Sequence, residues 1–260
     1  MAEYKNLLVA KEGPIAILTL NRPERFNVFG IEVWKEMEMA AREIEEMDDV
    51  RVVVINAAGQ HFAAGIDLKE LSTVSPEFAQ KHLGWLQSVY NKWEDFPLPV
   101  IAAIQGKCIG SGTELILACD IRVAARNARI SLPEVRFGLS PDMGGTTRLP
   151  RLVGPGQAKR LILACDEVDA EEARVIGLVE LVVEDDQLME QTMRLAKRIA
   201  AMPPVAVRLA KKGINLAMES SRMAGLYYEQ VQATFCNGTV DQKEAINSWF
   251  EKRQPVFKGR

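Results

Sequence analysis

Three acidic side chains in the middle of the chain stand among glycines and apolar residues rather than in charged runs. They are Glu114, Glu134 and Asp142. A carboxylate with such neighbours must be paired, hydrogen-bonded or shifted in pKa, because burial disfavours its charged form. General acid–base catalysis requires carboxyl groups of this kind. These three side chains are therefore the candidate catalytic residues.

Each acid also has a purely structural interpretation. Glu114 could act as a cap or ion-pair partner, and Glu134 could pair with Arg136 or Arg122 at a strand end. Asp142 could cap the glycine turn and the helix that follow it, as aspartate often does. The glycines and apolar residues around the two glutamates favour a catalytic role for them. For Asp142, a catalytic role and a capping role are equally compatible with the sequence.

The segments that position these acids alternate between strand and helix patterns. Apolar and β-branched runs predict strands, and apolar residues near every 3.6 positions predict helices. The expected strands are residues 7–9, 15–20, 51–56, 100–104 and 179–183, with another short strand between Asp120 and Leu132. The expected longer helices are residues 31–47, 76–96, 158–164, 170–176, 187–201, 205–219, 223–235 and 241–252. This order predicts an α/β fold whose C-terminal third is helical. Between the strands, Asp120 is expected to pair with an arginine such as Arg122 or Arg148.

Composition argues against several classes of function. The formal net charge of −3 gives no reason to expect a nucleic-acid partner. No apolar run approaches the roughly 20 residues of a membrane span, so no membrane partner is expected. The N-terminal residues lack the apolar segment of a secretory signal, and the four cysteines are scattered, which favours free thiols and a cytoplasmic location. The two histidines have no ligand spacing, so no metal site is expected.

Several short segments, in one order, carry a resemblance to a known family. They are LNRP at 20–23, FAAGIDLK at 62–69, PVIAA at 99–103, GSGTELILACD at 110–120, LPE at 132–134, GGT at 144–146 and FEKR at 250–253. Their order and spacing, over nearly the whole chain, resemble the crotonase superfamily of enoyl-CoA hydratases and isomerases. The resemblance implies a crotonase-like spiral of ββα units with a C-terminal helical trimerisation region. It also implies acyl-CoA thioester substrates and a place in fatty-acid metabolism.

The family shares an oxyanion hole made of two backbone N–H groups, which the resemblance assigns to Ile66 and Ser111. The local sequence supports the second assignment, because a helix is expected to begin at Ser111-Gly112. The first N–H groups of a helix are free and lie at the positive end of its dipole. An enolate forming there is stabilised, and losing one such donor typically costs about 10²–10³ in rate.

Glu114 and Glu134 match the two glutamates of the hydratases, which hold the water and move its proton. Asp142 departs from that pattern, because the hydratases usually have glycine at this place, whereas the dienoyl-CoA isomerases have three acids. The third acid therefore slightly favours isomerisation of a dienoyl-CoA, and hydration of a 2-enoyl-CoA by Glu114 and Glu134 is the alternative. A thioesterase or decarboxylase of the same fold and a non-catalytic RNA-binding relative are further alternatives.

The resemblance also implies a binding site for substrate and CoA. The residues that it assigns there are Arg25, Phe26, Ala64, Ile66, Leu68, Gly110, Trp249 and Lys252. Trp249 and Lys252 are expected to reach the CoA of a neighbouring subunit in a homotrimer or a dimer of trimers. Coenzyme A is part of the substrate, so no separate cofactor is expected. Residues 1–200 are expected to form the spiral core with the acyl-CoA site, and residues 201–260 the helical region.

Overall fold

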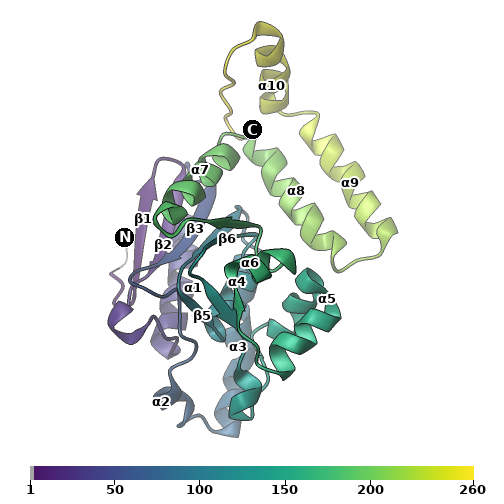
Figure 1. The fold of residues 1–260 in the computed structure, drawn as a ribbon. Coiled ribbons are helices and arrows are strands. Elements are labelled where there is room, and N and C mark those ends of the chain that lie inside the picture. Colours follow the sequence, from purple (N-terminus) through teal and green to yellow (C-terminus); the bar gives the residue numbers. More distant parts are fainter. Residues whose placement is uncertain (1–2) are drawn as a thin grey trace.

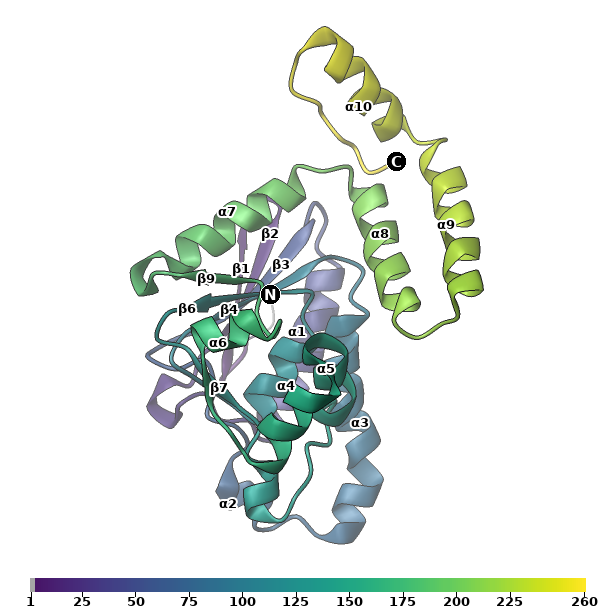
Figure 2. The same cartoon turned by 45° about the vertical axis from the view of Figure 1, so that its right-hand side comes forward.

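The structure, a computed structural model, describes residues 3–260 as a two-sheet body from which a helical arm projects (Figures 1 and 2). The larger sheet has the order β1-β2-β3-β4-β6-β9. Its strands are β1 (Leu7–Glu12), β2 (Ile15–Leu20), β3 (Val52–Ala57), β4 (Val100–Ile104), β6 (Ile121–Ala125) and β9 (Leu181–Val183). Only the β1–β2 hairpin is antiparallel, and the pairs from β2 to β9 are parallel. The α/β prediction is thus confirmed.

A second, smaller sheet of three short strands was missed by the sequence patterns. It contains β5 (Lys107–Ile109), β7 (Arg129–Ser131) and β8 (Val168–Asp169). The chain enters the larger sheet with β4 and the smaller one with β5, then forms a helix and repeats this course with β6 and β7. These ββα turns are the expected spiral. Strands of two or three residues are too short to show a period of two, which explains why the sequence did not reveal them.

Helices pack on both faces of the larger sheet because its central strands are buried on both sides. In β3, Val53 and Ile55 belong to the main core, whereas Val52 and Val54 face a second cluster that includes Leu188. The helices of the body are α1 (Ile31–Glu45), α2 (Leu68–Leu71), α3 (Pro76–Glu94), α4 (Ser111–Leu117), α5 (Gly145–Leu163), α6 (Ala170–Val175) and α7 (Leu188–Ala200). Three short 3-10 turns, η1 (Pro23–Arg25), η2 (Glu134–Phe137) and η3 (Asp185–Gln187), complete it.

The helix expected at 158–164 is the second part of the longer α5. Gly154 interrupts α5 with φ 75° and ψ 160°, and Pro155 follows it. The first part of α5, from Gly145, is the helix expected after the glycine turn, but its extent was not predicted because Pro150 and the glycines mask its helical period.

The arm consists of α8 (Pro204–Ala217), α9 (Arg222–Cys236) and α10 (Val240–Glu251). Lys211 attaches α8 to the body, since its Nζ donates to the carbonyl of Leu98 at 3.0 Å and to Asp120 Oδ2 at 2.7 Å. The prediction that Asp120 pairs with Arg122 or Arg148 is therefore wrong. α8 begins close to the expected boundary at residue 201, although the division into two domains stays a prediction.

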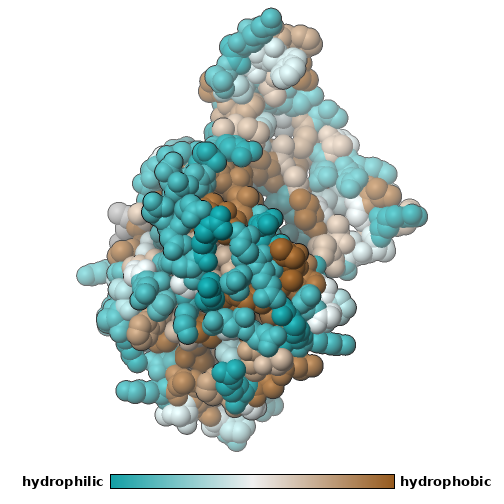
Figure 3. Space-filling model, in the orientation of Figure 1, coloured by the Kyte–Doolittle hydropathy of each residue, from teal (hydrophilic) through white to brown (hydrophobic). Residues whose placement is uncertain are grey.

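Hydrophobic surface is visible along the arm and where the arm meets the body (Figure 3). The exposed apolar side chains of the arm include Ile214, Leu226, Tyr227, Phe235 and Trp249, which are between 46% and 81% exposed. Across residues 3–260, no helix combines the length and the apolar character that crossing a membrane requires.

Candidate active site

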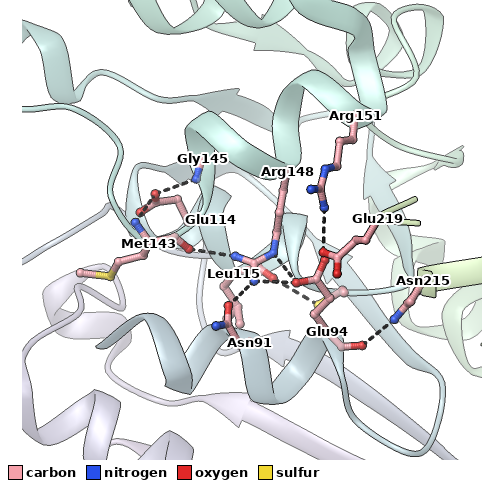
Figure 4. A network of polar contacts seen from close by, with 11 residues as sticks. Asn91, Glu94, Glu114, Leu115, Met143, Gly145, Arg148, Arg151, Asn215 and Glu219 are labelled. Carbon is pink, nitrogen blue, oxygen red and sulfur yellow. Dashed lines mark hydrogen bonds and ion pairs between the residues drawn. The ribbon is translucent and has the colours of Figure 1, made fainter. Parts of the chain in front are cut away.

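Glu114 lies inside the body on α4 and is only 2% exposed. Its Oε1 accepts hydrogen bonds from the backbone N–H groups of Met143 at 2.9 Å and Gly145 at 3.0 Å (Figure 4). Burial is the main cause that raises the pKa of Glu114 to about 7, and the charge of Glu134 adds to it, while the two N–H groups act in the opposite direction. The carboxyl group is thus held in one orientation and can gain or lose a proton near neutral pH.

Glu134 opens the turn η2 with its side chain toward the Gly110 backbone. A Cβ atom at Gly110 would lie 3.0 Å from Glu134 Oε1 and 3.7 Å from the Cα of Gly65. The other oxygen, Oε2, is buried and has no hydrogen-bond partner among residues 3–260. Burial, followed by the charge of Asp142, raises the pKa of Glu134 to about 7.

The alternative ion pairs of Glu134 do not form in the part of the chain that the structure describes. Arg122 instead binds Glu180 at 2.5 Å and the carbonyl groups that end α4. Within these residues, Glu134 Oε2 is therefore buried without an ion pair or hydrogen bond that would explain its burial, which is typical of a functional acid.

Asp142 precedes α5 without capping it. The residue in the N-cap position is Gly144, and no side chain accepts a capping hydrogen bond there. The carbonyl of Asp142 instead accepts from Gln87 Nε2 at 2.7 Å. Burial raises the pKa of Asp142, and its charge contributes to the raised pKa values of both Glu114 and Glu134. The capping interpretation is wrong, and the three acids share one electrostatic environment.

Two backbone N–H groups lie beside this acidic cluster without an acceptor. Phe29 and Ile66 form an isolated parallel bridge in which Phe29 donates to Gly65 and Asp67 donates to Phe29, so the N–H of Ile66 faces away from Phe29. Ser111 occupies the first position of α4, where no residue of the helix can accept its N–H. Within residues 3–260, neither N–H donates a hydrogen bond. The approach of Gly110 to Gly65 brings the two segments together.

The backbone at Ser111 is held by Tyr90, which sequence patterns did not single out, and by the turn at Gly110, which they did. Tyr90 of α3 is fully buried, and its hydroxyl donates to the Ser111 carbonyl at 3.4 Å while accepting from Trp34 Nε1 at 3.0 Å. Gly110 makes the turn into α4 with φ 53° and ψ −118°, a conformation that residues with a Cβ avoid. Two free N–H groups beside carboxyl groups with raised pKa values form an arrangement that could stabilise an enolate and supply it with a proton.

The sequence model of one family, described as enoyl-CoA hydratase/isomerase, matches residues 10–260. The chain belongs to the enoyl-CoA hydratase/isomerase family. It is 39% identical to the short-chain-enoyl-CoA hydratase of Clostridium acetobutylicum, over 99% of this chain and 100% of that protein. It is 36% identical to the crotonyl-CoA hydratase of Syntrophomonas wolfei, over 98% of each chain. The crystal structure of an enoyl-CoA hydratase from Bacillus anthracis superimposes with a TM-score of 0.95 at 37% identity, covering 98% of this chain and 100% of that one.

Most residues assigned to CoA by the resemblance to the enoyl-CoA hydratase/isomerase family lie in or against the segment 64–68, which meets the Gly110 turn beside Glu134. Ala64 donates its N–H to the Phe26 carbonyl at 2.9 Å, and Arg25 pairs with Asp67 at 2.6 Å, directly before Leu68. Phe26 and Leu68 are 56% and 54% exposed. The site thus joins a basic residue to exposed apolar side chains, as an anionic, partly apolar ligand requires.

Trp249 and Lys252 lie elsewhere, at the end of α10, where the arm is remote from α2 and α4 (Figures 1 and 2). Trp249 is 81% exposed. These two residues take no part in the site of their own chain, and their contact with a neighbouring subunit stays a prediction.

Proposed function

We propose that the protein adds water across the C2–C3 double bond of a short-chain 2-enoyl-CoA. The observation that carries the proposal is the pair Glu114 and Glu134, each with a pKa near 7, beside the free N–H groups of Ile66 and Ser111. The names of the relatives from Clostridium acetobutylicum and Syntrophomonas wolfei also favour hydration. We therefore place hydration ahead of the dienoyl-CoA isomerisation that the third acid favoured in the sequence.

In the proposed reaction the thioester oxygen accepts hydrogen bonds from the N–H groups of Ile66 and Ser111. Glu114, as a carboxylate, takes a proton from water while the water oxygen bonds to C3. The electrons of the double bond move toward the thioester, and the resulting enolate is stabilised by the two N–H groups. Glu134, as a carboxylic acid, then gives its proton to C2. No oxidation state of the protein changes, so the proposal needs no cofactor apart from the CoA of the substrate.

The surroundings of the two glutamates support this division of roles. Two N–H groups point at Glu114 Oε1, which favours its charged form, whereas Glu134 Oε2 is buried without a donor. Two nearby carboxyl groups with such pKa values share a proton, and the acid with fewer donors retains it.

The test is incubation of the purified protein with crotonyl-CoA, with the product identified by mass spectrometry. Hydration adds the mass of one water molecule and abolishes the absorbance of the conjugated thioester. Release of free CoA, release of carbon dioxide or no reaction would contradict the proposal.

We expect the protein to act in the cytoplasm, since all four cysteines are free thiols.

A second candidate function rests on Asp142, the third acid, whose side chain is exposed but whose charge raises the pKa values of both glutamates. A 3,5-dienoyl-CoA isomerase must remove a proton at one carbon and return one at a distant carbon, which a third carboxyl group can do. We propose to test 3,5-dienoyl-CoA in the same assay, where isomerisation leaves the mass unchanged. If it occurs, Asp142→Asn should lower its rate by about 100-fold or more, the usual loss for a proton-transfer group, and leave hydration within about tenfold. Unchanged isomerisation in that variant would exclude Asp142 as its acid.

We further propose that three copies, or two such trimers, associate through the arms. The exposed apolar side chains of α8, α9 and α10 are numerous for a chain that would stay alone in water. In this proposal Trp249 and Lys252 of one copy lie near the CoA bound by the next.

A further inference from the structure

Arg148 is a buried arginine of α5, only 6% exposed, whose guanidinium group is fully engaged. Its Nε and Nη2 donate to Glu94 Oε2 at 2.9 and 2.7 Å, and Nη2 also donates to Asn91 Oδ1 at 2.5 Å. Its Nη1 donates to the Met143 carbonyl at 3.0 Å (Figure 4). Three partners on two elements thus give the guanidinium one orientation, as its planar set of donors allows.

The residues 143–145 lie between this guanidinium and Glu114. Met143 directs its N–H toward Glu114 and its carbonyl toward Arg148, so both sides of the residue are held. Gly144 adopts φ 115°, and a Cβ atom at this position would overlap Arg148 Nη1. Because Gly144 has no Cβ atom, the arginine side chain can lie directly against the turn. In the same turn, the N–H of Gly145 donates to Glu114 Oε1.

We propose that Arg148 is a positioning residue for Glu114, because it holds the turn at 143–145 whose N–H groups orient that carboxylate. Arg148 does not touch the proposed site of the substrate, so its effect passes through Met143. The catalytic role of Arg148 rests on the proposed function, in which Glu114 is the base. The orientation of Glu114 by the turn at 143–145 is independent of that function.

The charges around Glu114 allow a specific consequence to be predicted. The groups that face it are Glu134 and Asp142, whose negative charges raise its pKa, and the neutral hydroxyl of Tyr90. The positive charge of Arg148 is balanced by Glu94, with which it forms an ion pair at 2.7 Å. The main effect of losing Arg148 is therefore the loss of the two aligned N–H groups, which favour the charged form. The pKa of Glu114 should rise as a result.

The variant Arg148→Lys tests the proposal, since lysine keeps the charge beside Glu94 but cannot hold Glu94, Asn91 and the Met143 carbonyl together. The pKa of Glu114 is measured in the intact protein by NMR titration with glutamate labelled by ¹³C at the carboxyl carbon. Its signal is assigned by its absence in Glu114→Gln. We expect a rise of about one pH unit above the wild-type value, equal to a tenfold change in proton affinity. The acidic limb of the kcat–pH profile with crotonyl-CoA should move in the same direction, with KM within about twofold.

Arg151→Lys is the matched control, because Arg151 lies three residues later on α5 and pairs with Glu219 at 3.1 Å, away from the turn. This control should leave the pKa of Glu114 unchanged. If Arg148→Lys does not fold, Asn91→Ala is used, which removes a neutral acceptor of Arg148 and leaves the charge of Glu94 in place, and it should cause a smaller rise. An unchanged pKa of Glu114 in a folded variant at Arg148 or Asn91 would overturn the proposal. Failure of the wild-type protein to hydrate crotonyl-CoA would instead refute the proposed function, since the NMR titration needs no turnover.

Discussion

At the scale of single residues, Glu114 and Glu134 are the same amino acid with similarly raised pKa values in different surroundings. Glu114 is 2% exposed and accepts two backbone N–H groups, whereas one oxygen of Glu134 is buried without any donor. The difference in hydrogen bonding favours a charged Glu114 and a protonated Glu134 near neutral pH. Two distinct roles, base and acid, can therefore come from one residue type.

Replacing Glu134 by glutamine should remove turnover with little change in CoA binding. The amide keeps the shape of the side chain but cannot give a proton to C2, and a general acid contributes about 10²–10⁴-fold to the rate. Steady-state hydration of crotonyl-CoA measures the first effect, and calorimetric titration with CoA the second. Turnover close to that of the wild-type protein would exclude Glu134 as the acid.

The variant Glu114→Gln should be more stable than the wild-type protein at alkaline pH and equally stable in acid. The pKa of Glu114 rises from 4.5 in the unfolded chain to about 7 in the folded protein. Below pH 4.5 both states are protonated, so the substitution changes little. As the pH rises from 4.5 to 7, the unfolded state loses its proton first, which lowers the stability of the wild-type protein.

We expect the gain in the free energy of unfolding to reach about 1 to 3 kcal/mol at pH 8, since one pKa unit corresponds to about 1.4 kcal/mol. Urea denaturation of both proteins at pH 4 and pH 8 provides the measurement. A gain of the same size at both pH values would show that packing, and not the charge of Glu114, is its cause.

At the scale of elements, the site depends on how strands end and helices begin. β5 ends at Ile109, and α4 starts at Ser111, so Gly110 alone makes the turn. Its N–H donates to the carbonyl of Ser131 in β7 at 3.0 Å, which links the turn to the smaller sheet. The short strands of that sheet thus hold the free N–H of Ser111 opposite the acids.

The variant Gly110→Ala should therefore lower both stability and activity. Alanine at φ 53° and ψ −118° is strained by about 1–3 kcal/mol, and its Cβ atom would press on Glu134 Oε1 from 3.0 Å. The matched control is Gly156→Ala in α5, where a Cβ atom meets nothing within 4 Å and alanine should stabilise the helix by roughly 0.5–1 kcal/mol. Denaturant unfolding and hydration assays of both variants provide the comparison. A neutral Gly110→Ala would contradict the close contact between the turn and Glu134.

At the scale of the whole molecule, the arm is attached to the body through α8 and through Phe257, whose carbonyl accepts from Arg51 at 2.8 Å. Lys211 and Asn215 of α8 bind the carbonyl groups of Leu98 and Glu94, each at 3.0 Å. Beyond these contacts, the arm exposes apolar residues on all three helices. An exposed apolar surface of this kind is typical of an interface between subunits.

Light scattering should accordingly give the wild-type protein three or six times the mass of one chain. The variant Phe235→Glu places a charge on α9, where the phenylalanine is 63% exposed, and should lower this mass because an unpaired charge is costly in an apolar interface. Met39→Glu is the control, since Met39 is 50% exposed on α1 in the body. A monomeric wild-type protein, or equal effects of the two variants, would contradict assembly through the arm.

The local sequence determined the longer helices, the strands of the larger sheet and the residue types of the site. The β-branched run at 51–56 and the helical period at 31–47 depend on neighbours along the chain, and both elements formed within a few residues of the expected bounds. The start of α4 at Ser111 was also predictable, because glycine and serine break a strand and begin a helix. Glu114 and Glu134 could be identified as candidates because charged residues rarely occur among glycines and apolar residues.

Only the tertiary structure decided which groups meet. Asp120 pairs with Lys211, which lies 91 positions away, and Arg148 reaches Glu94 across 54 positions. Tyr90 and Gln87 of α3 reach Ser111 and Asp142 in the same way, and the smaller sheet unites strands of two or three residues. Such contacts follow from the packing of elements against one another, and no local period or propensity encodes them. The raised pKa values of the acids have the same origin, because burial and the proximity of other charges exist only after the chain has folded.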